Sequence, residues 1–272
     1  MSLPALIAFV MSSPGAIALQ LGPLVVRWYG ILMAVAIVVG LWLAHREARR
    51  EALSADDIVS VGQWSVLAGL IGARAYEVVF NWDYYGQYPS KIIAVWEGGL
   101  AIHGGLIVGP LVGAFLAYRW RLPVLGGLDV AAPSLAIGQA IGRWGNFFNE
   151  EAFGQPTDLP WKLYISPERR PPGFTQHEFF HPTFLYESLW DLGVFLVLLL
   201  VLRQRFRERP GALFFAYLGL YSVGRFLIEG LRLDSFWLGS LRVPQLASVA
   251  GIVIAIAGIM WARRRAPVVP AH

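Results

Sequence analysis

The sequence predicts an all-α polytopic membrane protein with seven transmembrane helices. The chain has 272 residues, of which 56% are apolar and only 15% are charged, and its mean hydropathy is +0.55. A soluble domain carries about 25% charged residues, so this composition indicates lipid as the solvent for much of the chain. The second observation is a series of seven apolar stretches, each close to the ~20 residues that cross a bilayer as a helix.

The seven expected spans follow one another without a visible internal repeat. They comprise residues 25–44, 58–80, 98–118, 126–147, 183–202, 212–230 and 244–262, within one membrane domain over 25–262. Residues 1–24 contain an apolar run but no basic region, so we expect an outer interfacial segment and not a cleaved signal peptide. The connection 148–182 is rich in proline and is expected to form a small, non-helical outer cap.

The distribution of Lys and Arg predicts the orientation. Alternate connections carry twelve of these residues, in 45–57, 119–122, 203–210 and 263–265, whereas the other set carries six, in 81–97, 148–182 and 231–243. The positive-inside rule then places the N-terminus outside and the tail 263–272 in the cytoplasm. The basic excess is explained by topology, so we expect no nucleic-acid partner.

The absence of cysteine limits the chemistry. With no Cys in the chain there is neither a disulfide framework nor a nucleophilic thiol of the protein's own. The five His and the scattered carboxylates show no metal-ligand spacing. We therefore expect no metal and no cofactor, and activity that survives chelation.

Ionisable residues occur within or at the ends of the spans, most of them near the outer ends. Each would cost about 3 kcal/mol or more at the bilayer centre, so such groups face a polar interior and often mark function. Two pairs at helical spacing, Arg74 with Glu77 and Arg225 with Glu229, could instead simply neutralise each other. The set comprises Arg27, Arg74, Glu77, His103, Asp129, Arg143, Glu187, Asp191, Arg225 and Glu229.

Three segments concentrate the polar groups. Residues 96–105 surround His103 with glycines, and His is the side chain suited to proton transfer near neutral pH. Residues 142–154 combine Arg143, two amides and two carboxylates, and Arg offers the planar fork that grips phosphate. In the third segment Tyr221, Arg225 and Glu229 fall at i, i+4 and i+8, which predicts one polar stripe lining a cavity.

These segments resemble the bacterial prolipoprotein diacylglyceryl transferase family. The resemblance covers residues 27 to about 248, and its most specific part is the 13-residue segment at 142–154. One departure is Thr183-Phe184, where the family usually has Ser-Gln. The matching segments are R-W-Y-G at 27–30, G-A-R at 72–74, W-E-G-G-L-A-I-H-G-G at 96–105, G-R-x-G-N-F-x-N-x-E-x-x-G at 142–154, H-P-T-F-L-Y-E at 181–187 and Y-x-x-x-R-x-x-x-E at 221–229.

The resemblance implies an enzyme of the bacterial cytoplasmic (inner) membrane with its active site toward the outer face. Its partners would be phosphatidylglycerol, a preprolipoprotein signal peptide with a lipobox cysteine, and the surrounding membrane lipids. The diacylglyceryl group would move to the cysteine thiol, forming a thioether and releasing glycerol 1-phosphate. A substrate that supplies the sulfur agrees with a chain that has no cysteine.

The resemblance also implies roles for individual residues. His103 is the candidate base for the thiol, whose free pKa is ~8.5. Arg143 and Arg225 are candidate catalytic phosphate clamps, oriented by Glu151 and Glu229. The remaining expected substrate-binding residues are Tyr29, Asn146, Gly154 and Tyr221.

Other chemistries and another class of protein would also fit these residues. A carboxylate could take the proton, or nearby arginines could lower the thiol pKa enough to need no base. From another class, a transporter of an anionic lipid or small anion would also place arginines and glycines within its spans. A scaffold with buried ion pairs would leave the clustering of charges at one depth unexplained.

Overall fold

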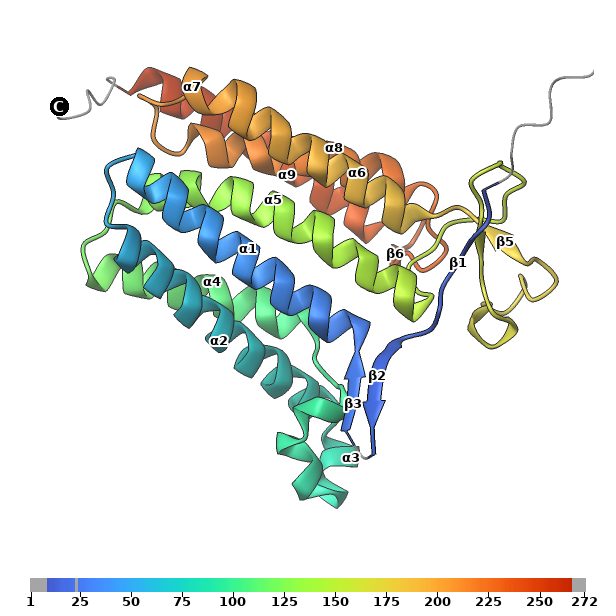
Figure 1. The fold of residues 1–272 in the computed structure, drawn as a ribbon. Helices are drawn as coiled ribbons and strands as arrows, with labels where there is room; N and C mark the ends of the chain where they lie inside the picture. The colour runs from blue at the N-terminus through green and yellow to red at the C-terminus, as the bar shows by residue number, and fades with distance from the viewer. Residues whose placement is uncertain (1–8, 23, 266–272) are drawn as a thin grey trace, which may run out of the picture. The chain divides into compact units, whose positions relative to one another are not determined.

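The computed structural model describes residues 9–22 and 24–265 and is mostly helical (Figure 1). Seven of its helical stretches are long and apolar enough to cross a membrane. The chain is thus a multi-pass membrane protein, as its composition predicts. The spans are α1 (Trp28–Arg50), α2 (Ala55–Phe80), α4 (Ile102–Arg119), α5 (Val124–Asn149), the continuous stretch Thr183–Arg205, α8 (Ala212–Glu229) and α9 (Val243–Arg264). The stretch Thr183–Arg205 consists of α6 (Thr183–Val197), the π-helical turn η4 (Leu198–Leu202) and α7 (Arg203–Arg205).

The first span begins three residues later than predicted. Residues 24–27 form strand β3 (Leu24–Arg27), which pairs antiparallel with β2 (Ile17–Leu21). The predicted N-terminal segment therefore contains β2 and the short strand β1 (Met11–Ser12), and β3 occupies the start of the predicted first span. Its residues 1–8, like residues 266–272 of the predicted tail, lie outside the described part of the chain.

The helices divide between two compact units, each considered by itself. The first comprises the chain up to Gly40 and from Ala131, and the second comprises Leu41–Val130. In the first unit α8 packs along α9, where small residues permit close approach: a Cβ added to Gly251 would lie 2.3 Å from Ser222 Oγ. The apolar core of this unit includes Val194, Leu198 and Leu213.

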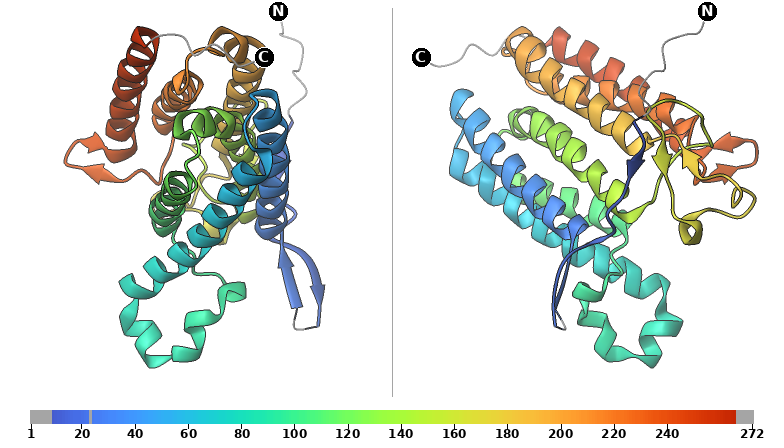
Figure 2. Two further views of the ribbon diagram at one scale, coloured as in Figure 1. Left: turned by 90° about the vertical axis from the view of Figure 1, so that its left-hand side faces the viewer. Right: turned by 45° about the vertical axis from the view of Figure 1, so that its right-hand side comes forward.

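In the second unit α2 packs along α4 through glycines. A Cβ on Gly104 would lie 2.1 Å from the backbone oxygen of Gly72, so no larger residue fits at that crossing. Between these helices the chain forms a loop of short helical turns, seen beyond the end of α2 in Figure 2. These turns are α3 (Trp82–Gln87), η1 (Pro89–Ile93) and η2 (Val95–Glu97).

The predicted cap is a small irregular layer in the first unit. Helix α5 runs to Asn149, two residues into the region 148–182 expected to be non-helical, and the chain then stays largely irregular up to α6. Strand β4 (Leu163–Tyr164) pairs with β5 (Phe179–Phe180) and with β1, and a short turn η3 spans Pro167–Arg169. Phe180 and Ile165 are fully buried in the apolar centre of this layer. A hairpin of β6 (Trp237–Leu238) and β7 (Leu241–Arg242) joins α8 to α9.

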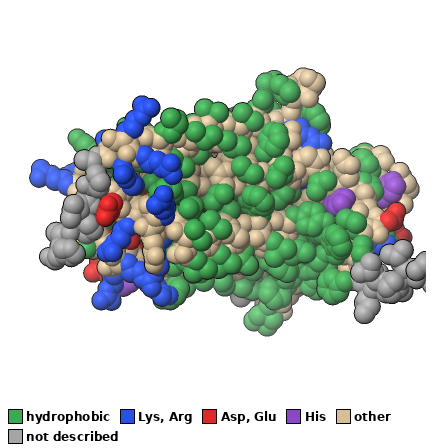
Figure 3. Space-filling view, turned by 90° about the horizontal axis from the view of Figure 1, so that it is seen from above, with side chains coloured by type: hydrophobic (Ala, Val, Ile, Leu, Met, Phe, Trp, Pro, Cys, Tyr) green, Lys and Arg blue, Asp and Glu red, His purple; other side chains and the backbone are tan. Residues whose placement is uncertain are grey.

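The surface of the spans is apolar. In the space-filling view, hydrophobic side chains cover most of the visible face, and Lys and Arg gather at the end where α7 lies in Figure 1 (Figure 3). In the apolar 18-residue stretch of each span, only 11–44% is buried inside the protein, so many large hydrophobic residues remain for lipid to cover.

Candidate active site

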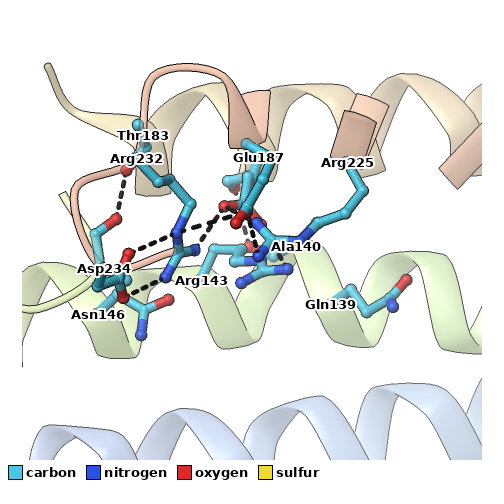
Figure 4. A network of polar contacts seen from close by, with 12 residues as sticks. Gln139, Ala140, Arg143, Asn146, Thr183, Glu187, Arg225, Arg232 and Asp234 are labelled. Carbon is cyan, nitrogen blue, oxygen red and sulfur yellow. Dashed lines mark hydrogen bonds and ion pairs between the residues drawn. The ribbon is translucent and has the colours of Figure 1, made fainter. Parts of the chain in front are cut away.

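A buried carboxylate joins three arginines in the first unit (Figure 4). Glu187, in the second turn of α6, forms ion pairs with Arg143 of α5, with Arg225 of α8 at 3.1 Å and with Arg232, which follows α8, at 3.0 Å. Its side chain is only 4% exposed. One glutamate thus ties together three segments that are 38–45 residues away in sequence.

A second buried glutamate completes the cluster. Glu229 is 0% exposed, and its Oε2 lies 2.6 Å from Arg225 Nη2 and 4.0 Å from Arg232 Nε. The pairing of Arg225 with Glu229 that the helical spacing suggests is therefore present. It is part of a larger network and not an isolated neutral pair.

Arg232 also forms a two-pronged pair with Asp234. Its Nε and Nη2 donate to the two carboxylate oxygens at 2.9 and 2.7 Å. Burial works to lower the pKa of Arg232, but the hydrogen bond and charge of Asp234 outweigh it and the pKa is raised. Burial works to raise the pKa of Asp234, but its hydrogen bonds and pairing with Arg232 lower it overall. Both groups are therefore charged at neutral pH.

The arginines form the accessible side of the cluster. The side chains of Arg143 and Arg225 are 21% and 18% exposed, against 4% and 1% for Glu187 and Glu229. Arg143 lies six residues before the end of α5 and Arg225 four residues before the end of α8, about 9 and 6 Å at 1.5 Å per residue. The guanidinium groups are therefore the more exposed part of the cluster and the carboxylates its buried part, near one end of three spans.

Packing between α5 and α6 positions this cluster. Trp144 Nε1 donates to Ser188 Oγ at 3.2 Å, and Ser188 Oγ donates to the backbone oxygen of Ala140 at 2.8 Å. Trp144 follows Arg143 and Ser188 follows Glu187 in sequence. The two bonds thus fix the register between the helices that carry Arg143 and Glu187.

The end of the 142–154 segment holds Glu151 in place. Glu150 and Ala152 have positive φ angles of 50° and 57°, so the backbone on both sides of Glu151 is in the left-handed region. Asn146 Nδ2 and Asn149 Nδ2 donate to Glu151 Oε1 at 3.0 and 3.2 Å. The partner predicted for Arg143 was Glu151, but Glu187 takes that place because α6 lies alongside α5.

The remaining predicted residues of this unit lie beside the same segment. The ring of Tyr29 covers Gly145, where an added Cβ would lie 2.6 Å from Tyr29 Cδ2. Tyr221, one turn before Arg225, stacks on Tyr217 with ring centroids 6.1 Å apart. Gly154 has a packing function, because an added Cβ would lie 2.8 Å from His181 Cβ. Direct contact of these residues with substrate stays a prediction.

His103 belongs to the second unit. It lies in the first turn of α4, and its ring stacks on Tyr76 of α2 with centroids 5.7 Å apart. The glycine crossing between α2 and α4 lies next to it, at Gly104. His103 therefore has a defined setting within its own unit.

Arg74 organises the loop that precedes His103. Its guanidinium donates to the backbone oxygens of Ile92 at 2.9 Å, Gly98 at 2.7 Å, Gly99 at 2.6 Å and Lys91, and it lies over the ring of Tyr85. The pairing with Glu77 considered from the spacing is thus not the main use of Arg74. A buried arginine bonded to four carbonyls acts as a loop anchor.

Sequence reasoning gave no role to Glu187, Arg232, Asp234 or Asp191. The sequence does show Glu187 and Asp191 as charges within a span, and the cost of burying a charge there indicates that they have partners. Asp191, one turn after Glu187, is 3% exposed, and its Oδ2 has no hydrogen-bond partner among the described residues. The described part of the chain includes no group of three or more His, Asp or Glu side chains that could hold a metal ion.

Comparison with known proteins identifies the family. The family model described as prolipoprotein diacylglyceryl transferase matches residues 16–261. A phosphatidylglycerol–prolipoprotein diacylglyceryl transferase of Trichormus variabilis is 48% identical over 265 residues, covering 96% of this chain and 93% of the relative. Its counterpart in Thermosynechococcus vestitus is 49% identical over 247 residues, covering 91% and 92%. The chain belongs to the prolipoprotein diacylglyceryl transferase family.

Proposed function

We propose that the chain transfers the diacylglyceryl group of phosphatidylglycerol to the thiol of a lipobox cysteine in a preprolipoprotein signal peptide. The sulfur attacks the glyceryl carbon that carries the phosphate ester, and a C–S bond forms as the C–O bond breaks. The electron pair of that bond leaves with the phosphate oxygen as glycerol 1-phosphate. The thiol proton passes to a base, and the product is a thioether.

Family membership makes the chain an enzyme of the transferase class. The alternative of an anionic-lipid or anion transporter is not favoured, since the relatives compared above are all named as transferases.

The mechanism rests mainly on one observation: Arg143 and Arg225 are paired with the buried carboxylates of Glu187 and Glu229. A phosphodiester leaving group gains negative charge as the C–O bond breaks, and fixed cations stabilise that charge better than mobile solvent does. Arg143 and Arg225 come from two helices, belong to the same cluster and have partly exposed side chains. We assign them to the phosphate oxygens, with the two glutamates fixing their orientation.

His103 is assigned to the thiol proton. Imidazole is the side chain best suited to accept a proton near neutral pH. The alternative, in which the arginines alone lower the thiol pKa, predicts a different pH dependence and is tested below. No step requires a metal ion or another cofactor.

Five further residues are assigned to substrate contact. Asn146 donates a hydrogen bond to Glu151, the ring of Tyr29 covers Gly145, and Tyr221 lies one turn before Arg225 on α8. Gly154 keeps the chain close to His181.

The orientation follows from the charge asymmetry. With twelve basic residues in one set of connections and six in the other, the cluster end of the first unit faces the outside of the bacterial cytoplasmic membrane. Secreted preprolipoproteins would reach the site from that side.

The test is an assay with the purified protein, phosphatidylglycerol and a lipobox peptide. Mass spectrometry should find the peptide heavier by a diacylglyceryl group, with glycerol 1-phosphate released in equal amount. A peptide with Ser in place of Cys and phosphatidylcholine in place of phosphatidylglycerol are the controls. Binding of lipid without any thioether would contradict the proposal.

A further inference from the structure

A second basic site lies at the other end of the same unit. A cavity of about 320 Å³ is lined by Arg205, Phe206, Arg209 and Arg263, which we call the basic pocket. Its volume is at the lower end of the range of roughly 300–1,000 Å³ for small-molecule sites. Glu187 and Arg205 lie 18 residues apart on one continuous helix, about 27 Å at 1.5 Å per residue. The pocket is therefore separate from the arginine cluster.

The three arginines of the basic pocket lack acidic partners among the described residues. Among the described residues, none of the ion pairs in this part of the chain involves Arg205, Arg209 or Arg263. In the active-site cluster, by contrast, every arginine is paired with a carboxylate. Three like charges around one cavity repel each other, so an anion bound there would relieve that repulsion.

The pocket has a fixed frame. Arg209 Nη1 donates to the backbone oxygen of Arg265 at 3.0 Å and also to that of Arg263, so the α7–α8 connection is tied to the end of α9. Phe206, one of the lining residues, is 9% exposed and packs into the apolar core with Leu213 and Ala262. A guanidinium has five N–H groups, so Arg209 can keep these bonds and still face a ligand.

The surroundings indicate where the anion comes from. The pocket lies at the end of the first unit where Lys and Arg gather in Figure 3, beside the apolar surface that lipid covers. Basic pockets between membrane helices on the cytoplasmic side are suited to phospholipid headgroups. A soluble anion would gain nothing from the neighbouring acyl chains, whereas a lipid can place its chains along the apolar helices.

We propose that the basic pocket binds the phosphate headgroup of an anionic phospholipid from the leaflet at that end of the helices. The bound lipid neutralises the three arginines and holds the α7–α8 connection against the end of α9. This site is separate from the proposed catalysis and does not depend on it.

The test uses native mass spectrometry of the delipidated full-length protein, titrated with phosphatidylserine, which is not the proposed substrate. The double variant Arg205→Gln/Arg263→Gln removes two lining charges and keeps Arg209 and its bonds. Each charge near an anionic headgroup changes affinity about fivefold, so the tightest binding event should weaken about 25-fold. Phosphatidylcholine with the same acyl chains should bind both proteins equally.

The matched control is Arg207→Gln/Arg264→Gln, which removes two exposed charges from the same connection and helix end but not from the pocket lining. It should bind phosphatidylserine within about twofold of the unmodified protein. Equal weakening in both double variants would mean general surface charge and would overturn the proposal. Displacement of the lipid by millimolar inorganic phosphate would identify a soluble-anion site and would overturn it as well.

Discussion

Glu187 and Arg232 form an ion pair of 3.0 Å that connects the second turn of α6 to the segment after α8. Because Glu187 also pairs with Arg143 and Arg225, its removal leaves three arginines without their central carboxylate. Removing one partner of a buried ion pair typically costs about 3–5 kcal/mol, since the remaining charge stays buried and uncompensated.

We therefore expect Glu187→Gln to lower stability markedly and to reduce turnover at least 100-fold, even in protein that still folds. Thermal unfolding in detergent and the thioether assay measure the two effects. Glu168→Gln, at an exposed glutamate of the cap, is the control and should change neither. Normal turnover in the Glu187 variant would contradict its role in orienting the arginines.

Arg143→Lys tests the phosphate clamp. Lysine keeps the positive charge but lacks the planar pair of donors that holds two phosphate oxygens and Glu187 together. Most activity should be lost while the protein still inserts and accumulates, and Arg169→Lys, at an exposed site in the cap, should remain fully active. If Arg143→Lys turned over at nearly the normal rate, Arg143 would be a structural charge.

The membrane orientation can be tested with single cysteines, because the chain has none of its own. Cysteine at the exposed Thr175 of the cap should react with an impermeant thiol reagent in intact cells, whereas cysteine at the exposed Gln204 should react only after lysis. The opposite pattern would invert the topology and put the arginine cluster on the wrong side for secreted substrates.

Arg74→Lys tests the loop anchor. A lysine cannot reach the four carbonyls that Arg74 joins, so the loop 88–99 should exchange its amide hydrogens faster and be cut more readily by trypsin after Lys91. Turnover should fall about tenfold or more, mainly through kcat, because His103 begins the helix that follows this loop. Arg119→Lys, exposed at the other end of α4, is the control. Unchanged exchange in the loop would contradict the anchor.

The spans were predictable because hydropathy is a local property of about 20 consecutive residues. Their ends were less so: α1 starts at Trp28 because residues 24–27 pair with β2, and no local pattern shows that pairing. The same limit applies to the site. Arg225 and Glu229 are one turn apart on one helix, so their pairing follows from spacing. Glu187 meets Arg143, Arg225 and Arg232 only after three distant segments pack together.

Arg74 shows the second limit. Charge pairing at i, i+3 suggested Glu77, yet the guanidinium bonds to backbone oxygens up to 25 residues away. Two of these oxygens belong to Gly98 and Gly99, whose φ angles of 101° and 72° turn the chain toward Arg74. A sequence pattern does not show which backbone groups a loop leaves unpaired, although an arginine with five donors is suited to satisfy several of them.

The last prediction concerns the proton. If His103 accepts it from the thiol, His103→Gln keeps similar size and hydrogen bonding but removes the base, and turnover at neutral pH should fall by about 10²–10⁴. The loss should shrink as the pH rises from 6 to 9, because the substrate thiol, with a free pKa of ~8.5, then ionises without help. His177→Gln, at an exposed histidine of the cap, is the control and should keep the normal profile. A small loss that stays constant with pH would instead mean that His103 only donates a hydrogen bond, and that the arginines supply the thiolate through their charge alone.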